Sequence, residues 1–369
     1  MKILAIIGAS YLQLPLVKKA KEMGVYTLCF AWEEGAVCKG VADEFHPISI
    51  VEKEQILQVC REKQINGICT IASDVAAPTV AFVAEHLGLV GNSYEVALRS
   101  SNKYQMRNAF VSAGIPCPKY QVVTSKSELH DRYDLPLIVK PTDRSGSLGI
   151  TKVTRQEDLL SAVDIALGCS FKHEAILEEY IEGREISVEF ISYQGKHYPL
   201  QITDKVTTEA PHFVELEHHQ PADLSREQYK EVYRLTEKAL NALGVTNGAS
   251  HSEYKITANG RVVVMEIGAR MGGDFIGSDL VYLSTGYDYL GGVIDVALGR
   301  FEIPSFGIPH CSGVFFVCEE TKHLRDLIKN GNVRQVVRSE ITDNELHRVK
   351  CSADRSGYMI YQGNKRLEL

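Results

Sequence analysis

The sequence predicts a protein of two or three lobes, in which a parallel α/β lobe is followed by α+β lobes. Short apolar runs alternate with helical patterns up to about residue 100, and longer strand patterns with smaller helices come after them. The length of 369 residues also exceeds what one compact core of typical size holds. Apolar residues make up 44% of the chain and charged residues 24%, which is typical of a globular protein.

Charge and cysteine content narrow the function classes. The chain has 40 basic and 47 acidic side chains, and no run of Lys and Arg forms a basic stripe, which argues against a nucleic-acid partner. No apolar stretch is long enough to span a bilayer, so we expect no membrane partner. The nine cysteines include no C-x-x-C pair and are expected to be reduced, which predicts a cytoplasmic location.

The amino-terminal pattern predicts a Rossmann-like parallel sheet. Residues 3–7 form an apolar run typical of a buried strand, residues 15–24 a helical pattern that ends at a glycine, and residues 26–30 the next strand. Strands separated by helices of this length pair in parallel and are covered on both faces. The alternation continues with a helix at 53–63, an apolar run at 67–72 and a helix at 75–88. We therefore expect an α/β domain over residues 1–98.

The turn after the first strand, residues 8–10, allows two interpretations. A glycine at this point lets a phosphate approach a helix N-terminus, as in a dinucleotide site. The second and third glycines of that fingerprint are missing, however, and no acidic residue clearly ends the second strand. The pattern favours a scaffold lobe whose turn faces a substrate.

The remaining chain predicts α+β structure. A capped helix and a Gly/Pro break come first, and a Pro-rich break past residue 300 leads into short strands and one helix. We expect an α+β lobe at 99–300 with a smaller subdomain at about 118–182, and a segment at 301–369 that completes the fold. The expected elements are a helix at 101–114, strands at 120–123 and 137–140, a helix at 158–168, strands at 175–181 and 186–193, and a helix at 323–331.

A lysine followed by a glycine loop is the first chemical signal. Lys140 ends an apolar strand, so its ammonium is expected at the mouth of the sheet. The small residues after it can fold their amides around phosphate oxygens; they are Ser145, Gly146, Ser147 and Gly149. The loop is not a P-loop, because the lysine precedes the glycines. An ordinary polar loop is the alternative.

A pair of glutamates on a predicted hairpin is the second signal. Glu253 and Glu266 lie on two strand patterns joined by an Asn-Gly turn, so they can face each other. Mg²⁺ takes one or two protein carboxylates beside a triphosphate, and we expect it here, with Mn²⁺ as an alternative ion. Arg270 follows the second strand and can add a cation. A solvated surface hairpin is the alternative.

A glutamate-rich segment after an apolar strand is the third signal. Glu178, Glu179 and Ile181 can present backbone groups to an adenine edge. Glu185, which follows a glycine-containing turn, can accept from ribose hydroxyls. A charged surface hairpin would explain the same residues.

Together these motifs resemble the ATP-grasp superfamily. The order is Lys103 in SNKYQMRNAF, Lys140 in IVKPTDRSGSLGI, Glu178 to Glu185, Glu253, and Met265 to Arg270 in MEIGAR. The match looks most like the carboxylate–amine ligase branch, which includes L-amino acid ligases and is related to carbamoyl-phosphate synthetase. The resemblance implies an ATP-grasp fold with three lobes: the Rossmann-like lobe, a small α+β lid and a larger α+β lobe for ATP and metal.

The resemblance also implies a role for each matching residue. Lys103 and Lys140 would bind phosphates, with Ser145 to Gly149 as the lid over them. Glu178, Glu179, Ile181 and Glu185 would bind adenine and ribose, and Glu253 and Glu266, thirteen residues apart, would bind Mg²⁺. Lys140 and Arg270 would be catalytic, Arg270 beside the reacting carboxylate. In place of the family's Glu-x-Asn, the chain has Gly268, which removes one oxygen ligand.

Residues 202–223 are expected to form a long irregular segment that contacts substrate. It contains Lys205, Glu215 and His218, which we expect to act with Arg270 on the substrate. The adjacent His218 and His219 point apart on an extended chain, which argues against a histidine metal site.

The function implied is an ATP-dependent ligase that activates a carboxylate as an acyl phosphate with Mg²⁺ and transfers it to an amine, with an amino acid or a related small molecule as the expected substrate. Its expected cofactors are ATP and Mg²⁺, and its expected partners are a small-molecule carboxylate and amine, with a homodimer as the candidate assembly. Two alternatives remain: an ATP-dependent carboxylase or one-carbon transferase of purine-pathway type, and a non-catalytic nucleotide-binding protein.

Overall fold

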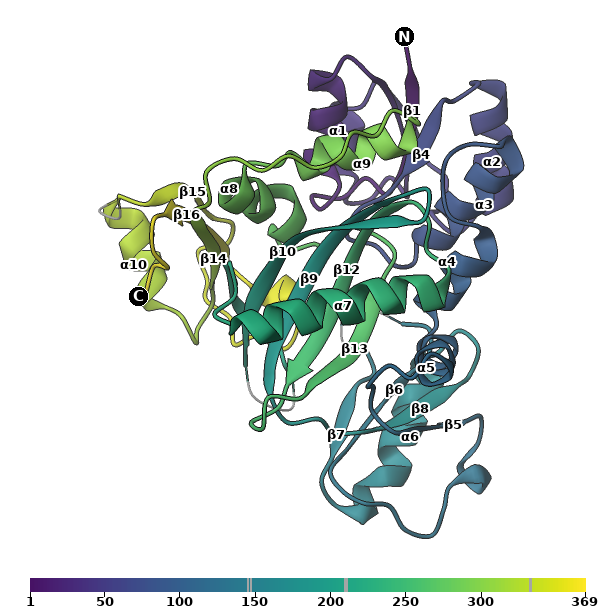
Figure 1. The fold of residues 1–369 in the computed structure, drawn as a ribbon, viewed down its shortest axis with the longest axis vertical. Helices are drawn as coiled ribbons and strands as arrows, with labels where there is room; N and C mark the ends of the chain where they lie inside the picture. Colours follow the sequence, from purple (N-terminus) through teal and green to yellow (C-terminus); the bar gives the residue numbers. More distant parts are fainter. Residues whose placement is uncertain (145, 147, 209–211, 332–333) are drawn as a thin grey trace.

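In the computed structural model, the described residues form three sheets. Figure 1 shows how they are arranged. The structure describes residues 1–144, 146, 148–208, 212–331 and 334–369. In that part of the chain, no helix combines the length and the apolar character that crossing a bilayer requires.

The amino-terminal sheet is parallel, as its sequence pattern predicts. Its strand order is β3-β2-β1-β4, and all three pairings are parallel. Buried apolar side chains on both faces of β1 explain why a continuous apolar run forms this strand. The elements are β1 (Ile3–Ile7), α1 (Leu14–Glu22), β2 (Tyr26–Phe30), η1 (Val37–Gly40), β3 (Glu44–His46), α2 (Lys53–Glu62), β4 (Gly67–Cys69) and α3 (Ala77–Leu87).

Two consecutive helices lead from this lobe to the next. In α4 (Tyr94–Ser101) and α5 (Lys103–Ser112), the side chains of Ser93 and Asn102 accept backbone N–H groups and cap the first turns. The predicted boundary after residue 98 lies inside α4.

A small antiparallel sheet forms the separate lobe at the bottom of Figure 1. Its order is β5-β8-β6-β7, and α6 packs on it through Leu159, Ala162 and Val163. The elements are β5 (Tyr120–Val123), η2 (Lys126–Glu128), β6 (Leu137–Pro141), β7 (Thr151–Val153), η3 (Gln156–Asp158), α6 (Leu159–Cys169) and β8 (Ala175–Glu179).

An eight-stranded antiparallel sheet forms the centre of the molecule. Its order is β13-β12-β9-β10-β11-β14-β16-β15, so strands from beyond residue 300 continue the sheet that starts at the predicted metal hairpin. The elements are β9 (Arg184–Tyr193), β10 (Lys196–Thr207), β11 (Glu215–Gln220), α7 (Arg226–Leu243), β12 (Gly248–Ile256), β13 (Val262–Gly268), η4 (Ile276–Leu280), α8 (Val281–Thr285), α9 (Tyr289–Ala297), β14 (Cys311–Val317), α10 (His323–Asn330), β15 (Val336–Ile341), η5 (Ser352–Asp354) and β16 (Gly357–Gly363).

Helices cover both faces of this central sheet. Helix α7 crosses the sheet in Figure 1 and buries Leu235, Leu240 and Leu243 against it, while Ser225 and Gln228 form a capping box at its start. Helix α9 lies next to α1 and shares one apolar core with the amino-terminal lobe. The first and central lobes are therefore packed through a continuous core.

The expectation of a long irregular segment at 202–223 is wrong. Residues 202–207 belong to β10, and Glu215–Gln220 form β11, which pairs with it in antiparallel register. The six residues ITDKVT carry mostly strand-forming types, and four of them are buried in the central sheet. The charged residues of this segment suggested a loop, but burial in the central sheet stabilises it as a strand.

Candidate functional site

The first residue of α5 connects three segments that the sequence assigned to one site. Lys103 Nζ lies 3.2 Å from Glu266 Oε1 on β13 and donates to the carbonyl oxygen of Arg144, 2.7 Å away, at the root of the glycine loop. The Lys103 backbone N–H also donates to the Thr142 carbonyl oxygen at 2.7 Å. The predicted phosphate lysine and the predicted metal ligand are thus in contact.

Lys140 belongs to a buried ion cluster between the lid lobe and α5. Its Nζ lies 2.7 Å from Glu178 Oε2 on β8, and Arg107 Nε lies 2.7 Å from the other oxygen of that carboxylate. Glu178 is 1% exposed and Arg107 fully buried. Burial would raise the pKa of Glu178, but the two cations outweigh it and lower the pKa to about 2.

Arg107 links this ion cluster to the metal hairpin. Its Nη2 donates to the Met265 carbonyl oxygen at 2.6 Å, next to Glu266. A continuous set of contacts therefore runs from Lys140 through Glu178 and Arg107 to β13. Arg107 was missed in the sequence because its partners are 71 and 158 positions away.

The two predicted metal ligands face each other. Glu253 and Glu266 are Cα partners across the β12–β13 hairpin, as the Asn-Gly turn predicts. Their side chains are 30% and 29% exposed, so both can reach a ligand in the site. No group of three or more His, Cys, Asp or Glu that could hold a metal occurs among the described residues. Two half-exposed carboxylates fit Mg²⁺, which keeps most of its waters, better than they fit a metal that needs a full protein cage.

A single buried ammonium holds three carboxylates beside this pair. Lys205 Nζ lies 2.7 Å from Glu253, 3.0 Å from Glu185 and 3.4 Å from Glu215. Burial would lower the pKa of Lys205, but these carboxylates raise it well above its ordinary value. Burial would likewise raise the pKa of Glu253, which Lys205 lowers well below its usual range. Lys205 and Glu215, expected at the substrate, thus contact the ribose and metal candidates.

A histidine–glutamate pair supports Glu253 from the other side. His251 Nε2 lies 3.4 Å from Glu253 Oε1, and its Nδ1 is paired with the fully buried Glu189. Glu189 also accepts the Gly272 N–H at 3.1 Å. A Cβ on Gly272 would lie 2.7 Å from His251 Nδ1, so glycine makes room for this pair.

Arg270 is paired with a residue of the amino-terminal lobe. Its Nη2 lies 2.7 Å from Asp74 Oδ2, and this ion pair joins β13 to the loop before α3. Burial would lower the pKa of Arg270, but Asp74 raises it. A Cβ on Gly268 would lie 2.7 Å from Asp74 Oδ1 and 3.2 Å from Arg270 Cζ. The departure from Glu-x-Asn at Gly268 therefore has a physical reason: an asparagine there would collide with this ion pair.

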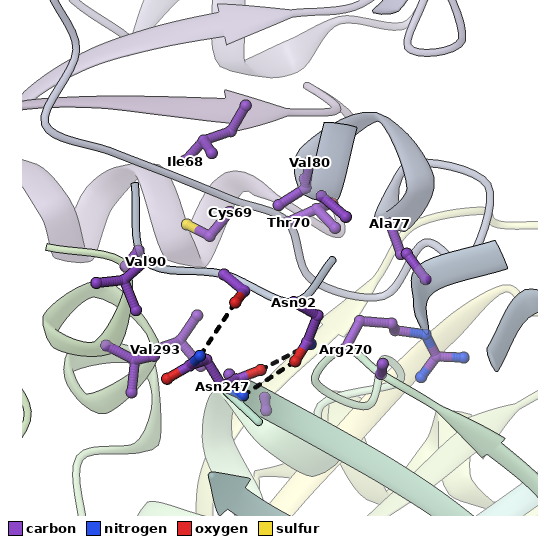
Figure 2. Close-up of a pocket in the computed structure, with 18 residues that line it drawn as sticks. Ile68, Cys69, Thr70, Ala77, Val80, Val90, Asn92, Asn247, Arg270 and Val293 are labelled. Atoms are coloured by element: carbon purple, nitrogen blue, oxygen red, sulfur yellow. Dashed lines mark hydrogen bonds between the residues drawn. The ribbon is translucent and has the colours of Figure 1, made fainter. Parts of the chain in front are cut away.

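A small pocket lies beside Arg270, between the first and central lobes. Its volume of about 70 Å³ is too small for a nucleotide. Asn92 accepts the Asn247 N–H at 3.0 Å and donates to the Asn247 carbonyl oxygen at 2.8 Å, which closes one side. Figure 2 shows these bonds, with the Arg270 guanidinium on the side away from Val90 and Val293. The pocket therefore belongs to the packing interface between the first and central lobes.

A much larger cavity opens on the other side of the Arg270 segment. It has a volume of about 1070 Å³ and is lined by residues 272–275, by the start of α1 and by the carboxyl-terminal segment. Asp274 and Arg355 form an ion pair in its wall. His218, predicted to contact substrate, lies behind Asp274, with Nε2 4.0 Å from its Oδ2.

Of the remaining predicted nucleotide contacts, two lie outside the described residues and the others are found in turns and at or just after the end of β8. Ser145 and Ser147 fall outside the part of the chain that the structure describes, whereas Gly146 and Gly149 both have positive φ in turns. Glu179 ends β8, and its N–H donates to the Lys119 carbonyl oxygen at 2.9 Å. Ile181 is buried in the connection between β8 and β9.

Known proteins are similar to this chain in sequence. Residues 133–279 match the family model of the ATP-grasp domain. The alanine–anticapsin ligase of Bacillus subtilis (strain 168) is 29% identical over 271 residues, which cover 64% of this chain and 57% of that protein. The chain thus matches little more than half the length of this curated relative.

Solved structures resemble nearly the whole fold. The L-amino acid ligase from Bacillus licheniformis superposes with a TM-score of 0.80 over 99% of this chain and 94% of that one, at 23% identity. N5-carboxyaminoimidazole synthetase from Staphylococcus aureus, solved in complex with ADP, has a TM-score of 0.80 with the same coverage, at 16% identity. At such identities the likeness establishes the fold.

Proposed function

This chain belongs to the ATP-grasp superfamily, and on that premise we propose that it is an ATP-dependent carboxylate–amine ligase. The single observation that carries the proposal is the contact between Lys103 and Glu266, which joins a phosphate-binding candidate to a metal-binding one. The proposed substrates are a small carboxylate and a small amine, by analogy with the named relatives. ATP and Mg²⁺ are the proposed cofactors.

The charged residues have separate roles in activating a carboxylate. Mg²⁺ held by Glu253 and Glu266 would neutralise charge on phosphate oxygens. Lys103 and Lys140 bind those oxygens from two sides, and Glu178 with Arg107 fixes Lys140 in place. Glu185 accepts from the ribose.

Arg270 acts at the second step. When the amine nitrogen attacks the acyl phosphate, a C–N bond forms and the C–O bond to phosphate breaks, with the electron pair leaving on the phosphate. The oxygen of the former carboxylate carries negative charge between these events, and Arg270 stabilises it. The amine proton passes to phosphate or water. Asp74 holds the guanidinium in position for this role.

Three further sequence predictions remain proposals. Nine free cysteines support a reducing, cytoplasmic location. The homodimer can be checked by light scattering, and the domain division at residues 98 and 300 by limited proteolysis. Both lines of work are independent of the catalytic proposal.

Substrate-dependent release of ADP tests the function. The purified protein with ATP and Mg²⁺ is screened against pools of amino acids and other small carboxylates and amines, with products identified by mass spectrometry. We expect one carboxylate–amine combination to stimulate ADP release and yield an equal amount of condensed product. Stimulation by bicarbonate alone would overturn the ligase in favour of a carboxylase, and no stimulation by any substrate would favour a nucleotide-binding protein without turnover.

A further inference from the structure

The large cavity contains a buried ion pair that the ATP site does not use. Arg355 Nη1 and Nη2 donate to the two carboxylate oxygens of Asp274 at 2.9 and 2.8 Å. The side chains are 7% and 23% exposed, and both residues line the cavity. Arg355 comes from the carboxyl-terminal segment, whereas Asp274 follows β13, four residues beyond Arg270.

The Arg355 guanidinium is fixed in orientation. Its Nε donates to the Ser352 carbonyl oxygen at 2.9 Å, and its Cζ lies 3.8 Å from the centre of the Phe316 ring. These contacts occupy the back and one face, and the remaining fork of N–H groups points at Asp274. A planar fork held in this way is the arrangement that binds a carboxylate through two parallel hydrogen bonds.

Asp274 reaches the fork from a segment with a strained backbone. Asp274 and Phe275 have φ of 49° and 65°, in the left-handed region that costs energy for residues other than glycine. They follow Gly272 and Gly273. Within the described residues, the ring nitrogens of the buried His218 have no hydrogen-bond partner, and Nε2 lies 4.0 Å from Asp274. His218 therefore offers Asp274 a second partner if a ligand takes Arg355.

We propose that Arg355 binds a free carboxylate of the amine substrate, which makes that substrate an amino acid; this inference rests on the proposed ligase function. The carboxylate to be activated belongs beside Arg270 and the metal glutamates. A carboxylate on Arg355 is a different one, which stays intact in the product. A molecule that keeps a carboxylate while its amine reacts is an amino acid. Asp274, displaced from the fork, then lies beside the incoming amino group and His218.

A competition experiment with the wild-type protein tests the inference. An L-amino acid and its isotope-labelled α-carboxamide compete at equal concentration for the same activated acid, and mass spectrometry gives the product ratio. A carboxamide is neutral and has a single acceptor oxygen, so it cannot replace the Asp274 carboxylate in the Arg355 fork. We therefore expect the amino acid to be incorporated about a hundredfold more than the carboxamide, or more. Equal incorporation of the amino acid and its carboxamide would overturn the inference. It would also be overturned if the enzyme required a second carboxylate on the activated acid and none on the amine.

Two variants locate the discrimination at Arg355. Arg355→Lys keeps the charge but loses the fork, and the double variant Asp274→Asn/Arg355→Gln removes both buried charges together. In each, we expect the amino acid to carboxamide ratio to fall toward one. Arg348→Gln, at an 87% exposed position in the same segment, is the matched control and should keep the wild-type ratio. A wild-type ratio in both Arg355 variants would overturn the assignment.

Hydroxylamine separates this inference from the ligase proposal. It is a small amine without a carboxylate that converts acyl phosphates to hydroxamates. Failure to form a hydroxamate with any acid that stimulates ADP release would count against the acyl phosphate itself. Hydroxamate formation together with equal use of amino acid and carboxamide would leave the ligase standing and remove only the role of Arg355.

Discussion

Two ion clusters in the site have opposite balance of charge. At the lid, one carboxylate, Glu178, lies between two cations, Arg107 and Lys140. At the hairpin, two ammonium groups, Lys205 and Lys255, lie among three carboxylates, Glu185, Glu215 and Glu253.

The difference indicates what each cluster is arranged to meet. The lid cluster has an excess of positive charge and is deeply buried, so it can face phosphate oxygens without rearranging. The hairpin cluster has an excess of negative charge and its glutamates are partly exposed, so it gains from a divalent cation. On the proposed function, the metal and the triphosphate would therefore meet complementary charge in different lobes.

Loss of charge at Glu266 is expected to have the largest effect. Glu266→Gln keeps the size of the side chain and removes charge from the metal side, and we expect ADP release to fall by at least about a hundredfold. Circular dichroism should show an unchanged fold. Glu302→Gln, at an exposed position, is the control. Near-normal turnover would show that the hairpin is not the metal site.

Glu178→Gln tests the lid cluster through stability. The pKa of Glu178 is lowered from 4.5 to about 2, which corresponds to about 3 kcal/mol of unfolding free energy. Because the folded pKa is depressed, this contribution is present above pH about 4.5 and is lost as pH falls through about 2. We expect urea unfolding to show a deficit of about that size at pH 7, which narrows between pH 4.5 and 2. A deficit independent of pH would contradict the charge argument.

Lys140→Ala is expected to weaken ATP binding by about tenfold, since one phosphate partner is lost while Arg107 still neutralises Glu178. Calorimetric titration with ATP and Mg²⁺ measures the change. The exposed Lys196, replaced by alanine, should bind ATP as the wild type does. If Lys140→Ala bound ATP with unchanged affinity, Lys140 would not be a phosphate-binding residue.

The smallest effect is expected at Lys205. In Lys205→Met, the three glutamates lose the ammonium that they share, so Mg²⁺ should stabilise the variant more than the wild type, by about 1 kcal/mol. Thermal unfolding with MgCl₂, compared with NaCl of matched ionic strength, measures this gain. If Mg²⁺ raised the unfolding temperature of both proteins equally, the hairpin cluster would not be a binding site for the ion.

Local patterns predicted most elements but few of the long-range partners. The strands at 3–7 and 26–30 formed where apolar runs predicted them, and Glu253 faces Glu266 because an Asn-Gly turn sets the register. Asp74 could not be found in this way, because its partner Arg270 is 196 positions away. Such pairs depend on how lobes pack, which no short window of sequence encodes.

Two misses did have a local signal. Ser225 and Gln228 at capping-box spacing precede a strongly amphipathic stretch, which indicates the 18-residue helix α7. The run ITDKVT likewise contains four β-branched residues, which favour a strand, although its charges suggested a loop. Charged residues therefore do not by themselves predict a loop, because a strand that borders a functional site can carry them on the face toward the site.

The central sheet does not stop where the ATP-grasp family match ends. Strand β11 is hydrogen-bonded to β10 on one side and to β14 on the other, and β14 to β16. Shortening the chain to residue 279 would strip β11 of its outer neighbour and leave a row of unpaired amide and carbonyl groups, a surface on which other chains can aggregate. The region that matches the family model is therefore shorter than the segment needed to complete the central sheet, and it should not be expressed alone as a folding unit.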